Sequence, residues 1–156
     1  MGTQDIKDDS ALQHLVRELE KLRRHNKTFK PGDPQDDLFL FAEAALTLVV
    51  LERFLRLLLG NLAAETHTLP NLLEIAVSKK LIELRHDKGP QVATKQLKDV
   101  RNTILHGNFE QAAKQAGRAS VAEYFRTDFA SEIEKVYWIT VDLVGQVLGP
   151  PTASPA

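Results

Sequence analysis

Residues 38–51, LFLFAEAALTLVVL, are the most apolar stretch of the chain and decide its fold class. Only Glu43 and Thr47 interrupt this stretch, and charged residues follow it from position 52. A bilayer-spanning helix needs about 20 mostly apolar residues, so we interpret the stretch as a buried helix of a globular protein and expect no membrane association. Because this helix is apolar nearly all round, it needs cover on every side. It is either the central helix of a monomer or, as we expect, partly buried in a homodimer interface.

Apolar residues at helical spacing continue on both sides of this stretch. Bounded by Pro, Gly and Asp signals, they predict helices over residues 10–24, 34–60, 70–84 and 91–106, a short helix over 109–116 and a long one over 120–148. Ser10 is the expected N-cap of the first helix, and Pro31-Gly32 ends it. The sequence therefore predicts an all-α fold, an up-and-down bundle of four long helices plus short extra helices. We expect a single domain over residues 1–148 and a disordered tail over residues 149–156.

Composition excludes several classes of protein. The 156 residues are 43% hydrophobic and 26% charged, which is typical of a globular domain and not of a disordered chain. No cysteine is present, so disulfides, thiolate nucleophiles and cysteine-bound zinc are excluded. The N-terminal sequence MGTQDIKDDSALQ lacks the apolar region of a secretory signal, and we expect a cytoplasmic protein. Neither a Gly-rich phosphate loop nor metal-ligand spacing of histidines is found, so we predict no cofactor and no metal.

The predicted helix 91–106 carries the most informative polar residues. Its core stripe consists of four apolar residues, Ala93, Leu97, Val100 and Ile104. At about 100° per residue, Asn102 and His106 lie about 40° apart on the side away from that stripe, with Arg101 on its flank. A guanidinium can neutralise a phosphodiester, and an imidazole can move protons near neutral pH. We therefore interpret Arg101, Asn102 and His106 as a candidate catalytic site. The alternatives are a surface salt bridge for Arg101 and a favourable helix-end cation for His106.

The segment Arg101-Asn102-Thr103-Ile104-Leu105-His106 resembles the R-x(4-6)-H signature of the HEPN superfamily, in which a polar residue usually follows the Arg. The similarity extends to the order of helices, because that family folds as a small helical bundle with the motif late in the chain. The sequence differs from one branch of the family at Asn108, where HEPN proteins paired with a nucleotidyltransferase antitoxin commonly carry a Tyr. The order of helices is thus similar over the whole predicted domain, whereas the motif itself comprises six residues.

This resemblance implies a function. Many HEPN proteins are metal-independent ribonucleases of toxin–antitoxin or defence systems, and they often dimerise so that two motifs face one cleft. We accordingly predict an endoribonuclease that leaves a 2′,3′-cyclic phosphate, acts as a homodimer on RNA, and has an antitoxin or another protein as a further partner. The alternative is a non-catalytic HEPN-like helical interaction module.

Two further features of the sequence could support such a site. Glu43 is a lone acid in the apolar stretch, either a partly solvated or interfacial helix residue or a group that orients Arg101 or His106. Residues 21–30 carry five positive charges and no acid on a chain of net charge −1. They form either a solvated helix end or a weak RNA-binding patch, with four candidate residues: Lys21, Arg23, Arg24 and Lys27.

Residues 109–129 also resemble a helix-turn-helix motif, with Ala113 and Gly117 in the expected places. Positions that should be apolar to pack the two helices instead carry Arg118, Glu123 and Arg126. DNA binding is therefore the least favoured of the three functions.

Overall fold

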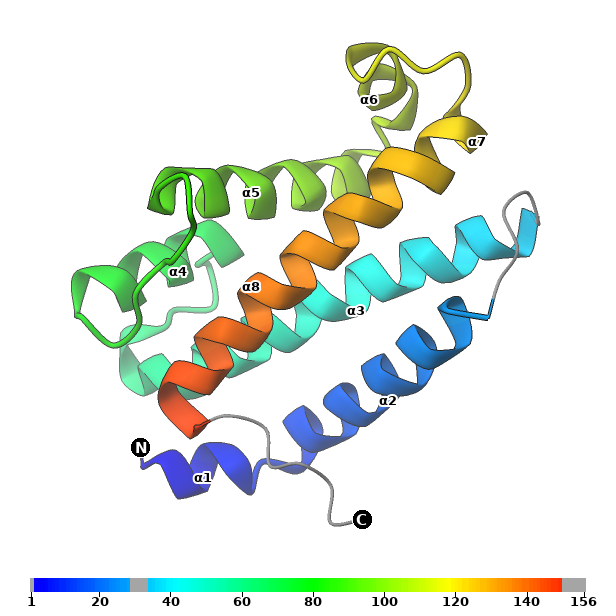
Figure 1. Cartoon of the computed structure of the whole chain (residues 1–156). Helices are drawn as coiled ribbons and strands as arrows, with labels where there is room; N and C mark the ends of the chain where they lie inside the picture. The colour runs from blue at the N-terminus through cyan, green and yellow to red at the C-terminus, as the bar shows by residue number, and fades with distance from the viewer. Residues whose placement is uncertain (1, 29–33, 150–156) are drawn as a thin grey trace.

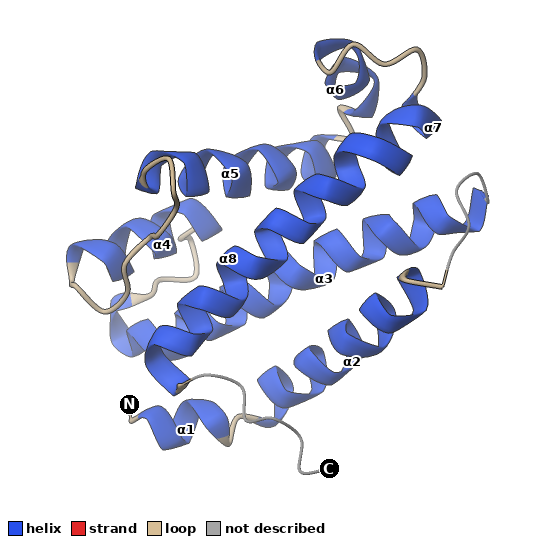
Figure 2. Cartoon of the chain, viewed as in Figure 1, coloured by secondary structure: helices blue, strands red, loops and turns tan. Residues whose placement is uncertain are grey.

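The computed structural model describes residues 2–28 and 34–149, and within these ranges every regular element is helical (Figure 2). This confirms the all-α prediction. The predicted break at Pro31-Gly32 and the predicted tail after Gly149 lie outside the described residues. No helix in the described ranges has both the length and the apolar character needed to cross a bilayer.

The elements follow one another along the chain as α-helices with two short irregular turns (Figure 1). In order they are α1 (Thr3–Lys7), α2 (Ser10–Asn26), α3 (Pro34–Leu59), the 3₁₀ turn η1 (Gly60–Leu62), α4 (Leu69–Ser78), α5 (Pro90–His106), α6 (Phe109–Gln115), α7 (Val121–Tyr124), the π-helical turn η2 (Phe125–Phe129) and α8 (Ala130–Leu148). The short helix α1 was not predicted, because its five residues contain only Ile6 as a buried apolar residue.

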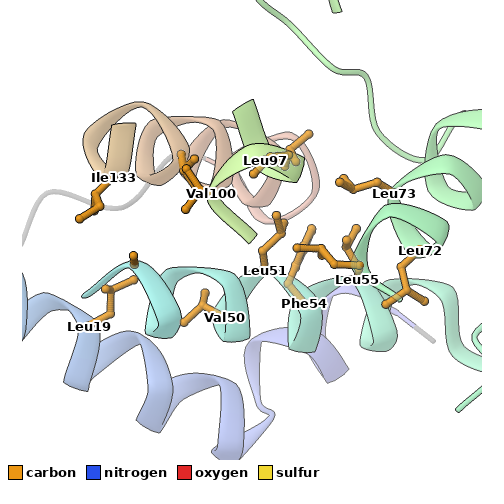
Figure 3. Close-up of a cluster of buried hydrophobic side chains, with 14 of the residues drawn as sticks. Leu19, Val50, Leu51, Phe54, Leu55, Leu72, Leu73, Leu97, Val100 and Ile133 are labelled. Carbon is orange, nitrogen blue, oxygen red and sulfur yellow. The ribbon is translucent and has the colours of Figure 1, made fainter. Parts of the chain in front are cut away.

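Helix α3 is the centre of the fold. Helix α2 packs against it in the opposite direction, α8 crosses it, and α4 and α5 lie on the side away from α2 (Figure 1). Side chains from these five helices meet in one apolar core, including Phe54 of α3, Leu97 of α5 and Ile133 of α8 (Figure 3). Burial of this apolar surface is the main force that holds the helices together.

The core leaves one narrow face of α3 uncovered. Leu38 is 67% exposed and Val49 is 49% exposed, while Ala42 and Ala45 are half-buried. At about 100° per residue these four residues fall within an arc of about 60°, so they form a continuous stripe. The exposed large apolar residues in the described part of α3 thus lie along this stripe, which we call the α3 stripe.

Two helix ends differ from the prediction. Asp9, not Ser10, caps α2, because its carboxylate accepts a hydrogen bond of 2.9 Å from the Leu12 amide. Helix α4 ends at Ser78 rather than near residue 84, since Lys80 adopts a left-handed conformation with φ of 59°. The chain after it is held by α8, where the Gln146 side chain bonds both the amide and the carbonyl of Glu83. A contact across 63 residues therefore overrides the local helical pattern.

The long helix predicted over 120–148 contains a π-helical turn at Phe125–Phe129. A π turn bonds residues five apart, and here it buries Tyr124 and Phe129 together. The ring of Phe109, at the start of α6, lies 4.8 Å from Phe125 and 5.6 Å from Phe129. This aromatic cluster anchors α6 beside the end of α5, which carries the candidate motif.

Candidate functional site

Helix α5 begins and ends where its sequence signals require. Pro90 occupies its first turn, where a missing N–H costs nothing. Gly107 follows its last residue with φ of 62°, a conformation that favours glycine. Ala93, Leu97 and Val100 are buried as predicted, so the opposite side of the helix is left for polar residues.

Arg101 is half-buried and lines a cavity of about 450 Å³ between α4 and α5. The wall contributed by α4 includes Leu73 and Glu74. Among the described residues, Arg101 has no hydrogen bond and no ion pair. The nearby carboxylate of Asp99 pairs with Lys95 instead. The guanidinium is therefore free to meet a ligand.

Asn102 is exposed and faces a different depression, a polar groove of about 550 Å³ between α5, α6 and the start of α8. In this groove the Tyr124 hydroxyl donates a hydrogen bond of 2.9 Å to Glu132. Burial raises the pKa of Glu132, and the neighbouring carboxylates of Asp128 and Asp99 raise it further. Burial likewise raises the pKa of Tyr124, with Glu132 as the next cause. Asn102 therefore borders a polar groove that is separate from the cavity lined by Arg101.

His106 is the last residue of α5 and is exposed. No described residue forms a hydrogen bond or an ion pair with its imidazole, so both ring nitrogens are accessible. On an ideal helix His106 lies about 40° from Asn102 but about 140° from Arg101. Within one chain the motif is thus spread around α5, and Arg101 and His106 do not converge on one point.

Two of the remaining sequence candidates, Arg23 and Glu43, belong to a buried cluster on the other side of α3, which we call the Arg23 clamp. Arg23 of α2 is only 7% exposed, and its guanidinium bonds Glu43 of α3 at 3.2 Å and Glu134 of α8 at 3.0 and 3.1 Å. The guanidinium carbon also lies 3.3 Å from the centre of the Tyr137 ring. Asn26 donates a 2.9 Å hydrogen bond to the other oxygen of Glu43. The clamp ties α2, α3 and α8 together.

These contacts correct two expectations. The carboxylate of Glu43 is bound by Arg23 and Asn26, so it is not available to orient Arg101 or His106. Arg23 is buried and ion-paired, so it does not belong to an exposed basic patch. The ion pair with Arg23 is also the main reason that the pKa of Glu134 is lowered.

The other three basic candidates are exposed: Lys21 and Arg24 on the C-terminal half of α2, and Lys27 directly after it. Lys21 pairs with Glu18 one turn earlier. Exposed cations of this kind can attract RNA but carry no sequence information. In the described ranges no group of three His, Asp or Glu side chains is arranged to hold a metal ion.

In the segment that resembles a helix-turn-helix, Arg118 is engaged by acids of the same segment. Arg118 forms a bidentate pair with Asp128 at 2.6 and 3.2 Å, and it also pairs with Glu123. Helix α7 is four residues long before the π turn begins. A recognition helix needs several turns that carry side chains to base edges, and α7 is only about one turn long.

Sequence reasoning did not find the neighbours of Arg101 and Asn102. The α4 wall beside Arg101 and the Tyr124–Glu132 pair beside Asn102 are set by the packing of distant segments. One local signal was available, because Lys98 stands one turn before Arg101 and lines the same cavity.

Comparison with protein-family models, with curated proteins and with solved structures gives no match to this chain. The functional conclusion therefore depends on the residues of α5 and on their geometry.

Proposed function

We propose that the protein is a homodimeric, metal-independent endoribonuclease of the HEPN type. This proposal rests on the accessibility of Arg101 and His106 on α5. Both lie outside the core stripe, and neither is engaged by another described side chain. The HEPN resemblance requires an accessible guanidinium and an accessible imidazole near the end of one helix. It also requires an all-helical fold with the motif late in the chain.

The spread of the motif around α5 is the reason for proposing a composite site. Since Arg101 and His106 are about 140° apart on one helix, a single phosphate can meet both groups only if they come from two chains. A two-fold axis near the end of α5 would bring each Arg101 toward the His106 of the partner subunit.

The α3 stripe is the surface that we propose for the contact between subunits. Its exposed residues run from Leu38 in the N-terminal half of α3 to Val49 just past the middle of the helix. The start of α6, directly after the motif, packs on this same half, with the Phe41 and Phe109 rings 6.0 Å apart. A dimer formed through the stripe would therefore place its axis near the motif.

The proposed chemistry needs two proton transfers and one charge stabilisation. The ribose 2′-oxygen attacks the adjacent phosphorus, the bond from phosphorus to the 5′-oxygen breaks, and a 2′,3′-cyclic phosphate remains. The 2′-hydroxyl loses a proton and the leaving 5′-oxygen gains one, and His106 would serve one of these transfers. Arg101 would stabilise the negative charge of the phosphorane. Asn102 would hold the RNA backbone by hydrogen bonds.

An RNA cleavage assay in EDTA tests the activity. Wild-type protein should cut single-stranded RNA and leave cyclic phosphate ends. His106→Ala should lower the rate by about 10²- to 10⁴-fold, the usual contribution of general acid–base catalysis. Lys114→Ala, which removes an exposed cation from α6, is the matched control and should keep the wild-type rate.

Each outcome of this assay has a definite meaning. Cleavage by His106→Ala at the wild-type rate would refute the catalytic assignment. Absence of cleavage by the wild-type protein and by the Arg101→Ala/His106→Ala double variant would favour the interaction module. That alternative is favoured by the same observation that requires a dimer, namely that one chain does not bring Arg101 and His106 together.

Sedimentation of two matched charge variants tests the dimer. Val49 and Leu62 are 49% and 47% exposed, but only Val49 belongs to the α3 stripe. Val49→Asp should give a monomer without activity, whereas Leu62→Asp should remain a dimer with wild-type activity. A wild-type monomer at tens of micromolar would contradict the composite site and leave the helical fold unaffected.

A further inference from the structure

The cavity between α4 and α5 has an apolar wall and a charged rim. Four leucines and Val77 line the wall: Leu69, Leu73 and Leu97 are at most 4% exposed, so Leu84 and Val77 are its more accessible apolar residues. Its volume of about 450 Å³ lies in the range of about 300 to 1,000 Å³ that is usual for small-molecule sites. The site is therefore large enough for a small molecule and too small for a folded partner.

The rim of the cavity is positively charged. Lys98 and Arg101 stand one turn apart on α5, and Glu74 of α4 is the acid that lines the cavity opposite them. None of these three side chains forms a hydrogen bond or an ion pair with another described residue. Glu74 therefore does not neutralise the two cations, and their donors point to a ligand that carries an anionic group.

The chemistry of the lining also tells which anion fits. No aromatic side chain lines the cavity in the described part of the chain, so it lacks the stacking surface on which proteins usually hold nucleobases. A wall of leucine side chains instead suits a saturated hydrocarbon, whose burial is favourable in proportion to its area. A molecule with a hydrocarbon body and one anionic head would match both parts of the cavity.

We propose that this cavity binds an amphiphilic carboxylate of the fatty-acid class, with its chain along the apolar wall at Leu84 and Val77 and its carboxylate between Lys98 and Arg101. Arginine suits this role because its planar donor fork matches the two oxygens of a carboxylate. The carboxylate would occupy Arg101, which the proposed ribonuclease site also uses, so the two ligands would compete for this side chain. Decanoate binding is measured without RNA, so its outcome is distinguishable from that of the cleavage assay.

Calorimetric titration with three probes of equal chain length tests the charge preference. Decanoate, decan-1-ol and decyltrimethylammonium share the hydrocarbon body and differ in the head group, and each is used below its micelle-forming concentration. Decanoate should bind at one saturable site per chain, and the other two probes should bind at least about fivefold more weakly. Equal binding of decanoate and decanol would overturn the proposal, as would the absence of saturable decanoate binding.

Two charge-neutralising variants on opposite walls test the location. Lys98→Gln removes a cation and should weaken decanoate binding about two- to fivefold, the range expected for a solvent-exposed ion pair. Glu74→Gln removes a negative charge from the facing wall, so it should strengthen decanoate binding by a similar factor. Lys114→Gln on α6 is the control and should have no effect. Weakening by Glu74→Gln, or no effect of Lys98→Gln, would contradict the proposed site.

Methyl NMR locates the chain of the ligand independently of charge. Decanoate should shift the methyl signals of Leu84 and Val77. The control signal is that of Leu62, which is exposed on η1 and should not move. Shifts confined to Leu62 or to other exposed apolar residues outside the cavity would show non-specific surface binding and overturn the assignment.

Discussion

Two arginines on helices that lie on opposite sides of α3 (Figure 1) have opposite surroundings. Arg23 of α2 is buried, bonds two carboxylates and lies on the face of an aromatic ring. Arg101 of α5 is half-buried, lines an apolar-walled cavity, and has no hydrogen bond or ion pair within the described residues. The chain thus holds one arginine inside a closed network and leaves the other open.

Arg23 is therefore a charge that serves the fold, whereas Arg101 is a charge that is available to a ligand. A buried charge is tolerated only if it is paired and hydrogen-bonded, so the Arg23 clamp is expected to matter for folding. An unengaged guanidinium at a cavity contributes little to folding and keeps its donors for a ligand. Three predictions test this contrast between the two regions.

The largest effect is expected from matched alanine variants of the two arginines. Arg23→Ala leaves Glu43 buried without its ion partner, so the free energy of unfolding should fall by about 3–5 kcal/mol. Arg101→Ala removes no hydrogen bond or ion pair to another described residue, so it should change the free energy of unfolding by less than about 0.5 kcal/mol. Urea unfolding followed by circular dichroism measures both. Equal losses for the two variants would remove the contrast between the two regions.

An intermediate effect is expected at the other buried member of the clamp. Glu43→Gln keeps one oxygen as an acceptor for Asn26 but loses the charge that faces Arg23, so it should cost about 1–2 kcal/mol of unfolding free energy. Glu20→Gln, the same change at an exposed position of α2, is the control and should stay within about 0.5 kcal/mol of wild type. A neutral Glu43→Gln would show that Glu134 alone satisfies Arg23.

The smallest effect is expected beside Asn102, at Glu132. Burial and nearby carboxylates raise the pKa of Glu132, so folding favours its neutral form. Its contribution to stability is fully present below the ordinary glutamate pKa and is lost as the pH rises through the raised value in the folded protein. Glu132→Gln stays neutral and still offers an oxygen to the Tyr124 hydroxyl. The stability of this variant relative to wild type should therefore increase between pH 4 and pH 7.

Thermal unfolding at several pH values measures this difference. Thr127→Ser, a conservative change at an exposed position of the π turn, is the control and should follow the wild-type pH dependence. A difference that falls as the pH rises would show that Glu132 is stabilised in its ionised form, in contradiction to its surroundings.

Much of the fold could be predicted because its helices carry local signals at their ends. Pro90 and Gly107 bound α5, and the predicted range 91–106 differs from the observed one by a single residue. Prediction was wrong where a distant contact decides the conformation. The end of α4 depends on Gln146, and the π turn depends on packing against Phe109.

For the candidate site, the sequence by itself determined which residues of α5 lie outside the core, because a helix of 3.6 residues per turn that buries Ala93, Leu97 and Val100 must turn Asn102 and His106 away from them. Only the tertiary structure decided which groups each polar side chain contacts. Charge and spacing do not distinguish Arg23 from Arg101, since both are arginines near the C-terminal end of an amphipathic helix. Helices α3 and α8 place two carboxylates and an aromatic ring around Arg23, whereas α4 places an apolar wall beside Arg101. The physical reason is that the partners of a side chain are set by helix packing between segments far apart in the chain, which the period of a single helix does not encode.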